Sequence, residues 1–297
     1  MTYQDPLILR RRLRVELRNA RNSKGLTQKD VASTLGWSPS KLIRIENGSV
    51  GVTIPDLKAL LEEYGVSDRA RIDELVEMSR RAREPGWTSF SDVLSKGLLT
   101  YLSYEASAAR TYQFQPSVLP GLLQTEEYTR AVLRDVTEMP PDQHDRLWNV
   151  RQRRQELHDR ENPPAMFFVL DEAVIRRRLG GPAVMARQLR RLAEDAALPH
   201  VTLQVIPFSA GGHTGMTGPI VILQFADPNV DDIVYLEGTR GDLTFLDDPD
   251  EASRYLNDFF RLQERALSAV DSLALLNDAI DGLVGGGADQ PNERPGG

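Results

Sequence analysis

Cysteine is absent from the 297 residues. Without thiols the chain can form no disulfide, no thiolate metal site and no cysteine nucleophile. No apolar run approaches the ~18–20 residues that a membrane-spanning helix requires, so we expect no membrane segment. The first six residues lack the apolar core of a secretory signal, which predicts a cytoplasmic protein.

Motifs that identify enzymes are missing as well. The sequence contains no nucleophile elbow, Walker loop or dinucleotide fingerprint. Asp171-Glu172 could form a carboxylate pair, but Asp171 is better explained as the cap of a helix. No two histidines have the HxxxH or HExxH spacing of metal ligands; the four are His144, His158, His200 and His213. We therefore expect no catalytic residue, metal or cofactor, with an enzymatic body as the weakest alternative.

Charge is distributed unevenly along a chain whose length allows two domains. Hydrophobic residues make up 40% and charged residues 27%, a globular composition. The net charge is −7, yet residues 1–83 carry 16 Lys and Arg against 11 Asp and Glu, a net charge of +5. The chain thus joins a basic module to an acidic body, and the basic surface would attract phosphate. A charged helix face in contact with water is the alternative explanation of the basic residues.

The basic module has the pattern of short helices separated by glycine. Leucines at helical spacing predict a first helix that begins near Leu9 and ends at Gly25. Thr27 and Asp30 form a capping box for a second helix, Gln28 to Leu35. A fourth helix is predicted from Pro55 to Tyr64, and a connecting helix from about residue 67 to 83.

The third helix, roughly Ser38–Asn47, carries the functional signal. Ser38 is its expected cap and Pro39 its first residue. Two short helices joined by a turn with glycine make a helix-turn-helix, whose second helix enters the DNA major groove. Leucine and isoleucine anchor this helix, which leaves hydroxyls and cations outside. The candidate DNA-binding residues are Gln28, Ser38, Ser40, Lys41, Arg44 and Asn47.

Residues 17–48, LRNARNSKGLTQKDVASTLGWSPSKLIRIENG, resemble the phage-repressor-type (XRE) helix-turn-helix family. The resemblance implies that Gln28 and Asn47 hold phosphates and that Ser40 and Arg44 read bases. Glu46 is better explained by a pairing with a nearby arginine, and Trp37 by core packing. Ile43 faces outward, where it would contact a thymine methyl or a partner.

The remaining chain predicts an α+β domain, in which helices pack on a small, mostly antiparallel sheet. The last three predicted strands follow one another closely and favour a meander. The predicted helices are 98–111, 125–137, 141–160, 172–179, 183–197, 249–267 and 271–283. The predicted strands are 165–170, 201–207, 220–225, 233–237 and 243–246. The predicted organisation is a DNA-binding domain (1–66), a connecting helix and linker (67–94), a body (95–284) and a disordered tail (285–297).

Two segments of the body are candidate binding surfaces. The loop of residues 209–219 contains four glycines and is far longer than a hairpin needs. Its candidate partner- or ligand-binding residues are Gly211, His213, Thr214 and Met216, although a floppy connection is an equal alternative. The second candidate is Gly121–Thr125, where Thr125 is better explained as a helix cap and the leucines as core.

Several phrases of the body, among them PSVLPGLLQTEEYTRAVL (116–133) and VTLQVIPFSAGGHTGMTGPIVILQF (201–225), resemble the Scr1-type antitoxin-like regulators. The resemblance implies a regulator from a high-GC bacterium, encoded beside a small partner protein. The expected function is a DNA-binding transcription regulator, a homodimer controlled by that partner or by a ligand. The alternative is an antitoxin that mainly neutralises the partner by direct binding.

Overall fold

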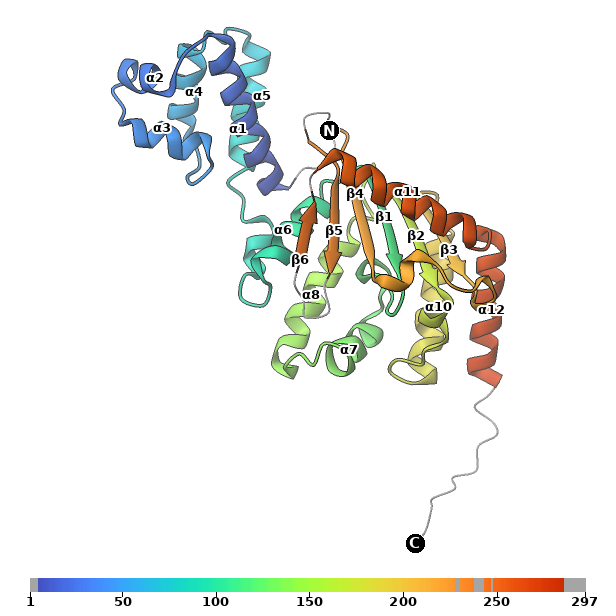
Figure 1. The fold of residues 1–297 in the computed structure, drawn as a ribbon. Coiled ribbons are helices and arrows are strands. Elements are labelled where there is room, and N and C mark those ends of the chain that lie inside the picture. The colour runs from blue at the N-terminus through green and yellow to red at the C-terminus, as the bar shows by residue number, and fades with distance from the viewer. Residues whose placement is uncertain (1–4, 228–229, 238–242, 247, 286–297) are drawn as a thin grey trace. The chain divides into compact units, whose positions relative to one another are not determined.

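The computed structural model describes residues 5–227, 230–237, 243–246 and 248–285 (Figure 1). Contacts divide the chain into two compact units, Met1–Ser107 and Ala108–Gly297. This division falls later than the boundary expected at residue 95, because the helix of residues 96–105 packs against the first helix. The expected disordered tail lies outside the described residues except for Gly285.

The N-terminal unit is a helical bundle with an apolar centre. Leu17, Leu42, Leu57 and Leu60 from three different helices are each at most 1% exposed and belong to one core. The helices of the bundle are α1 (Pro6–Ser23), α2 (Gln28–Thr34), α3 (Pro39–Glu46), α4 (Ile54–Glu63) and α5 (Arg69–Arg81), and a further helix, α6 (Lys96–Glu105), follows. The predicted all-α bundle is therefore confirmed.

Local signals in the sequence set the ends of these helices. Thr27 accepts a hydrogen bond from the Asp30 amide while the Asp30 carboxylate accepts one from the Thr27 amide, which is the predicted capping box. Gly36, with φ of +65°, follows α2, and Gly48, with φ of +78°, follows α3. Both positions require the left-handed conformation that glycine adopts without steric cost.

The C-terminal unit is built on a mixed sheet. In the described part of the chain the strands form one six-stranded sheet in the order β3-β2-β1-β4-β5-β6. The first three of these are mutually parallel, and the remaining pairings are antiparallel. The strands are β1 (Arg110–Gln115), β2 (Ala165–Asp171), β3 (Val201–Ile206), β4 (Ile220–Gln224), β5 (Ile233–Glu237) and β6 (Leu243–Leu246).

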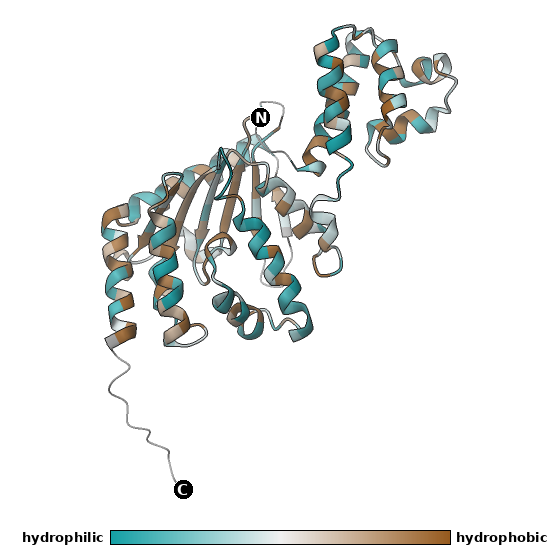
Figure 2. Ribbon diagram, turned by 180° about the vertical axis from the view of Figure 1, so that it is seen from behind, coloured by the Kyte–Doolittle hydropathy of each residue, from teal (hydrophilic) through white to brown (hydrophobic). Residues whose placement is uncertain are grey.

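Helices cover both faces of the sheet, and alternate residues of the strands pack on opposite sides. Phe168 of β2 joins the core formed with α7, α10 and α12, whereas Val169 joins the core formed with α11. Hydrophobic residues accordingly fill the strands and the inner sides of the helices (Figure 2). The helices of this unit are α7 (Glu126–Asp135), α8 (His144–Gln155), α9 (Glu172–Arg176), α10 (Pro182–Ala196), α11 (Pro249–Arg265) and α12 (Ala269–Gly285).

The α+β class and the β4-β5-β6 meander are as predicted, but β1 was not expected. The helix predicted over residues 98–111 ends at Glu105, and its last residues instead enter the central strand β1. Within β1 the side chains of Thr111 and Gln113 are buried and hydrogen-bonded to each other at 3.2 Å. Because Thr111 and Gln113 are polar, the sequence does not predict this strand, although Tyr112 and Phe114 lie on its other face. Across the described residues, no helix combines the length and apolarity needed to cross a membrane.

Candidate nucleic-acid interface

Helix α3 has one anchored side and one exposed side. Leu42 and Ile45 are 0% and 3% exposed and hold the helix on the core of the bundle. Ser40, Ile43 and Arg44 are exposed on the opposite side. The inward and outward residues therefore lie as their spacing predicts. A short helix that presents hydroxyls and a guanidinium has the chemistry of a recognition helix.

Glu46, the last residue of α3, ties this helix to its neighbours. Its side chain is 1% exposed and accepts hydrogen bonds from Arg21 Nε at 2.7 Å and Nη2 at 3.0 Å. Gln28 Nε2 donates to the same carboxylate at 2.7 Å. The hydrogen bonds that Arg21 donates to Glu46 raise the pKa of Arg21 above its ordinary value. We call Arg21, Gln28 and Glu46 the Glu46 bracket; it confirms the predicted structural role of Glu46.

The bracket changes how Gln28 is understood. Sequence reasoning assigned its side chain to a DNA phosphate, but one amide N–H is already donated to Glu46. Gln28 is half-buried and is the first residue of α2. The main-chain N–H groups in the first turn of a helix are free of intrahelical partners and attract anions. Gln28 therefore combines a bond inside the bundle with a position at an anion-attracting helix end.

Lys41 is also engaged within the bundle. Its Nζ lies 2.7 Å from Asp56 Oδ1 of α4 and 3.7 Å from the centre of the Trp37 ring. Trp37 is half-buried against the bundle core, as predicted. The Lys41 interactions link the N-terminal half of α3 to α4. Lys41 thus has less reach toward a DNA base or phosphate than the sequence alone indicates.

The N-terminal end of α3 differs from the prediction in how it is capped. Ser38 occupies the cap position, but its side chain forms no capping hydrogen bond; the predicted hydroxyl cap is wrong. The Lys41 amide, which a cap would engage, donates to the Ser38 carbonyl at 2.9 Å, and the Ser38 hydroxyl lies 3.1 Å from that of Ser40. At the other end exposed Asn47 accepts hydrogen bonds from the Ser49 amide and hydroxyl through Oδ1.

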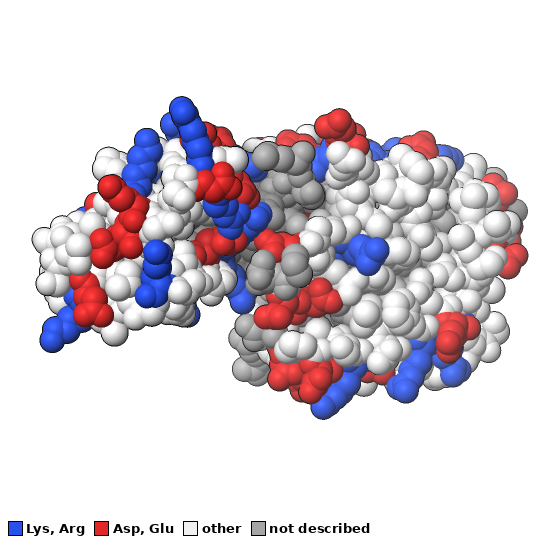
Figure 3. Space-filling model, turned by 90° about the horizontal axis from the view of Figure 1, so that it is seen from above, with Lys and Arg blue, Asp and Glu red and all other residues white. Residues whose placement is uncertain are grey.

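Charges of both signs are mixed on one face of the bundle. On the face in view in Figure 3, Lys and Arg side chains of the N-terminal unit alternate with Asp and Glu. Arg44 is exposed and its Nε donates to the Ser40 carbonyl at 3.3 Å. Of the two cations of α3, Lys41 is paired with Asp56 and Arg44 is exposed, so Arg44 is the better placed for a specific contact.

The loop of residues 209–219 in the C-terminal unit is folded and packed. It contains two short 3₁₀ helices, Phe208–Ala210 and Thr214–Thr217. The His213 side chain is 3% exposed, and its Nε2 lies 3.1 Å from Asp171 Oδ2. Its ring also meets Phe114 edge-on, with centroids 5.6 Å apart. His213 thus faces inward, and the exposed candidates of this loop are Gly211, Thr214 and Met216.

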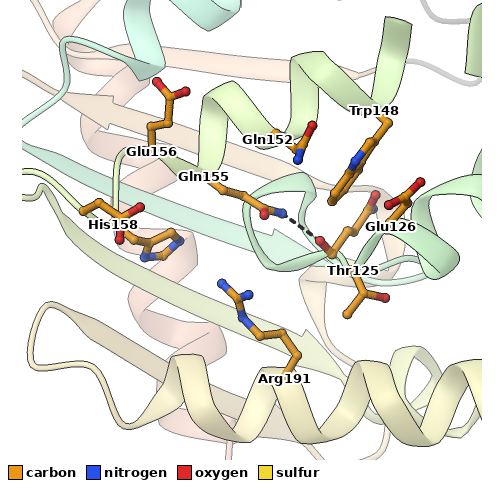
Figure 4. A pocket seen from close by; sticks show the side chains of 10 residues that line it. Thr125, Glu126, Trp148, Gln152, Gln155, Glu156, His158 and Arg191 are labelled. Atoms are coloured by element: carbon orange, nitrogen blue, oxygen red, sulfur yellow. Dashed lines mark hydrogen bonds between the residues drawn. The ribbon is translucent and has the colours of Figure 1, made fainter. Parts of the chain in front are cut away.

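A polar pocket of about 480 Å³ borders the second candidate segment, Gly121–Thr125. Within that segment Thr125 caps α7 and the two leucines are core, both as predicted. Figure 4 shows Trp148, Gln152 and Gln155 projecting from α8 while Arg191 approaches from α10. The Gln155 amide donates to the Gln124 carbonyl at 2.7 Å, which fixes one wall of the pocket.

His158, one of the residues that line this pocket, forms a pair with His200. His158 Nδ1 and His200 Nε2 lie 3.1 Å apart. Burial, and after it the neighbouring His200, lower the pKa of His158 to about 4. Burial also lowers the pKa of His200, so both rings are neutral near pH 7. Among the described residues, no cluster of three or more His, Asp and Glu side chains is arranged to hold a metal ion.

Comparison with protein families assigns both parts of the chain. A family model described as a helix-turn-helix domain matches residues 12–75, so the N-terminal domain is of a DNA-binding type. A second model, described as a domain of unknown function (DUF5753), matches residues 98–278, more than half of the chain. The chain belongs to the DUF5753 family. Neither a curated protein nor a solved structure matches it.

The pocket of the DUF5753 domain gathers residues that sequence reasoning did not select. Trp148 and Gln152 are one helical turn apart on α8, a spacing that the sequence does reveal. Arg191 lies on α10 and His158 follows α8, and only the fold brings them together. In the sequence, the pocket is indicated only by the polar face of α8 with its one large aromatic residue. Such a face is too common to predict a pocket.

Proposed function

We propose that this DUF5753 protein is a transcription regulator that reads a specific DNA sequence with α3. The observation that carries the proposal is the exposed face of Ser40, Ile43 and Arg44 on the second helix of a helix-turn-helix domain. In this proposal Arg44 and Ser40 read base edges and Ile43 contacts a thymine methyl. Gln28 and Asn47 contact phosphates, since they lie at the start of α2 and at the end of α3.

A homodimer is part of the proposal. A single small module buries too little surface for tight and specific binding. Two copies would place one α3 in each half-site, with the half-sites about 34 Å apart along the duplex. Ser38 and Lys41 would assist from the start of α3. Lys41 does so while paired with Asp56, so its contribution is smaller than that of Arg44.

The test is a selection of bound DNA from a random pool, followed by affinity measurements on the selected site and its single-base variants. We expect Arg44→Ala to weaken binding by about 1–3 kcal/mol and to relax specificity at one position. Gln28→Ala should weaken all variants to a similar extent. Arg69→Ala, which removes an exposed arginine of α5, is the control for loss of charge.

Gln28→Ala also removes a hydrogen bond to Glu46, so its folded fraction must be measured alongside its affinity. An equal loss across all site variants for Arg44→Ala and Gln28→Ala would contradict the separate roles. A profile for Arg44→Ala that matches that of Arg69→Ala would remove Arg44 from the reading face.

We further propose that the DUF5753 domain controls DNA binding, and that the protein is cytoplasmic and not an enzyme. The pocket lined by Trp148, Gln155 and Arg191 supports control by a small ligand. A second candidate function is an antitoxin that binds a small partner protein. It is favoured by two exposed apolar side chains at the loop, Met216 at 70% and Phe208 at 61% exposure. Co-purification with the product of a neighbouring gene, and DNA selection with and without it, distinguishes the two.

A further inference from the structure

A groove of about 570 Å³ lies on the N-terminal unit between α1, α5 and the segment that follows α3. Its floor is apolar and includes the buried side chains of Leu13, Leu17, Ile45 and Val52. Four arginines also line it; they are Arg10, Arg11, Arg14 and Arg83. A volume within about 300–1,000 Å³ and an apolar lining with few polar groups are typical of small-molecule sites.

The four arginines are held by neutral acceptors. Arg14 Nη1 donates to the Asn47 carbonyl and Arg83 Nη2 to the Val52 carbonyl, each at 2.7 Å. Arg11 donates to the Tyr104 hydroxyl at 2.8 Å. The fourth, Arg10, donates to two main-chain carbonyls. Among the described residues that line the groove none is acidic, so these bonds orient the guanidiniums without balancing their charge.

Other arginines of the same bundle form ion pairs with glutamates. Arg21 pairs with Glu46, and Arg71 pairs with both Glu16 and Glu74. In those pairs a carboxylate offsets the positive charge. The groove is therefore a part of the bundle where cations converge on an apolar surface and where no carboxylate among the described lining residues supplies a counter-charge.

Arg14 is the guanidinium most in need of that counter-charge. Its Nε is buried and has no hydrogen-bond partner within the described part of the chain. Burial, and then repulsion from Arg11 and Arg18, lower the pKa of Arg14 below its ordinary value. An arginine nevertheless stays charged near neutral pH. A bound anion would offset both costs, whereas a neutral ligand would offset neither.

We propose that this groove binds a small amphipathic acid. The apolar body of the ligand lies on the leucine, isoleucine and valine floor, and its carboxylate or phosphate meets the guanidiniums of Arg11 and Arg14. A DNA phosphate is a poorer match, because a phosphodiester makes no use of an apolar floor. The floor and the arginines together require a ligand with both parts.

The groove is physically connected to α3. Asn47 follows the last residue of α3, and its carbonyl accepts the hydrogen bond from Arg14. An acid that binds the Arg14 guanidinium competes with the Asn47 carbonyl for its N–H groups and weakens this link between α1 and the end of α3. Bound acid is therefore expected to weaken DNA binding. This second step rests on the proposed function, whereas binding of the acid does not.

Calorimetric titration of the full chain with decanoate tests the site, with decanol and acetate as probes that keep only one half of the ligand. We expect saturable decanoate binding. Decanol, which loses the charge-assisted contact, and acetate, which loses the apolar contact, should each bind more weakly by about tenfold or more. Arg14→Gln should weaken decanoate by about tenfold and Arg14→Lys by less. Arg69→Gln, an exposed arginine outside the groove, should change nothing.

Equal binding of decanol and decanoate, or full decanoate binding by Arg14→Gln, would overturn the site. Arg14→Lys keeps the cation, so it decides the case if Arg14→Gln fails to fold. Competition by duplex DNA of random sequence, lost in Arg14→Gln, would assign the groove to the DNA backbone and also overturn it. Decanoate binding with unchanged affinity for the selected DNA refutes only the link to α3. Absence of any DNA binding refutes the proposed function and leaves the titration result in place.

Discussion

Replacing Glu46 by alanine is the sharpest test of how α3 is held. The change removes a carboxylate whose side chain is 1% exposed and leaves the Arg21 guanidinium, 12% exposed, without its partner. Removing one partner of a buried ion pair costs about 3–5 kcal/mol. Arg21 keeps one hydrogen bond, to the Leu26 carbonyl at 2.8 Å, and some access to water. We therefore expect the lower end of that range, a loss of about 3 kcal/mol in the free energy of unfolding.

Hydrogen exchange of the full chain measures this loss where it occurs. Peptides that cover α3 report the opening of the bundle without interference from the C-terminal unit. A loss of about 3 kcal/mol corresponds to a fall of about 100-fold in protection of the α3 amides. Glu62→Ala, which removes an exposed carboxylate of α4, is the matched control. Its effect should stay within about 0.5 kcal/mol.

Unchanged protection of α3 in Glu46→Ala, or a change no larger than in Glu62→Ala, would refute the reasoning. A second comparison separates the ion pair from packing. Replacing Arg21 and Glu46 together by methionine should cost less than Glu46→Ala alone, because no unpaired charge remains in the bundle. A double variant that loses as much as the sum of its single changes would show that the two side chains act independently.

Two further predictions concern the C-terminal unit. Because burial and His200 lower the pKa of His158 from 6.5 to about 4, the unfolded chain binds more protons between these values; stability should fall by up to about 3 kcal/mol as pH decreases through this range. Urea unfolding as a function of pH should show a flatter dependence in His158→Gln, and an unaltered slope would contradict the assignment. A Cβ on Gly215 would overlap a ring carbon of buried Phe114, so Gly215→Ala should cost about 1–3 kcal/mol. A Cβ on Gly212 meets open space, and equal melting temperatures of Gly212→Ala and Gly215→Ala would disprove the close packing of the loop.

The N-terminal bundle was predictable because its signals are local. Thr27 with Asp30, and the glycines at 36 and 48, determine where the helices begin and end within a few residues of chain. The α3 anchors Leu42 and Ile45 follow from helical spacing alone. Even the structural role of Glu46 was foreseen, although the residue that donates to it from α2 was not.

The C-terminal unit shows what local patterns leave out. In β1 the buried Gln113 amide donates a hydrogen bond to the buried Thr111 hydroxyl on the same face of the sheet. Because both residues are polar, their sequence does not predict a buried strand. The glycine-rich loop predicts that His213 is exposed to a ligand or partner. In the structure its side chain is buried and contacts Asp171, which is 42 residues away in the sequence. Such pairings depend on which strands become neighbours. They are properties of the topology, which no spacing within a single segment reveals.

The attachments of α3 affect how any loss of DNA binding should be interpreted. Arg14 and Arg18 donate to the carbonyls of Asn47 and Glu46, so α1 holds the C-terminal end of the helix. Lys41 pairs with Asp56 of α4 near the other end. Two of the candidate DNA-binding residues, Gln28 and Lys41, thus also hold α3 in the bundle, Gln28 through Glu46 and Lys41 through Asp56. Arg44 lies outside these attachments, since it donates only to the Ser40 carbonyl of its own helix in the described structure. A loss of affinity therefore reports a direct contact most clearly at Arg44.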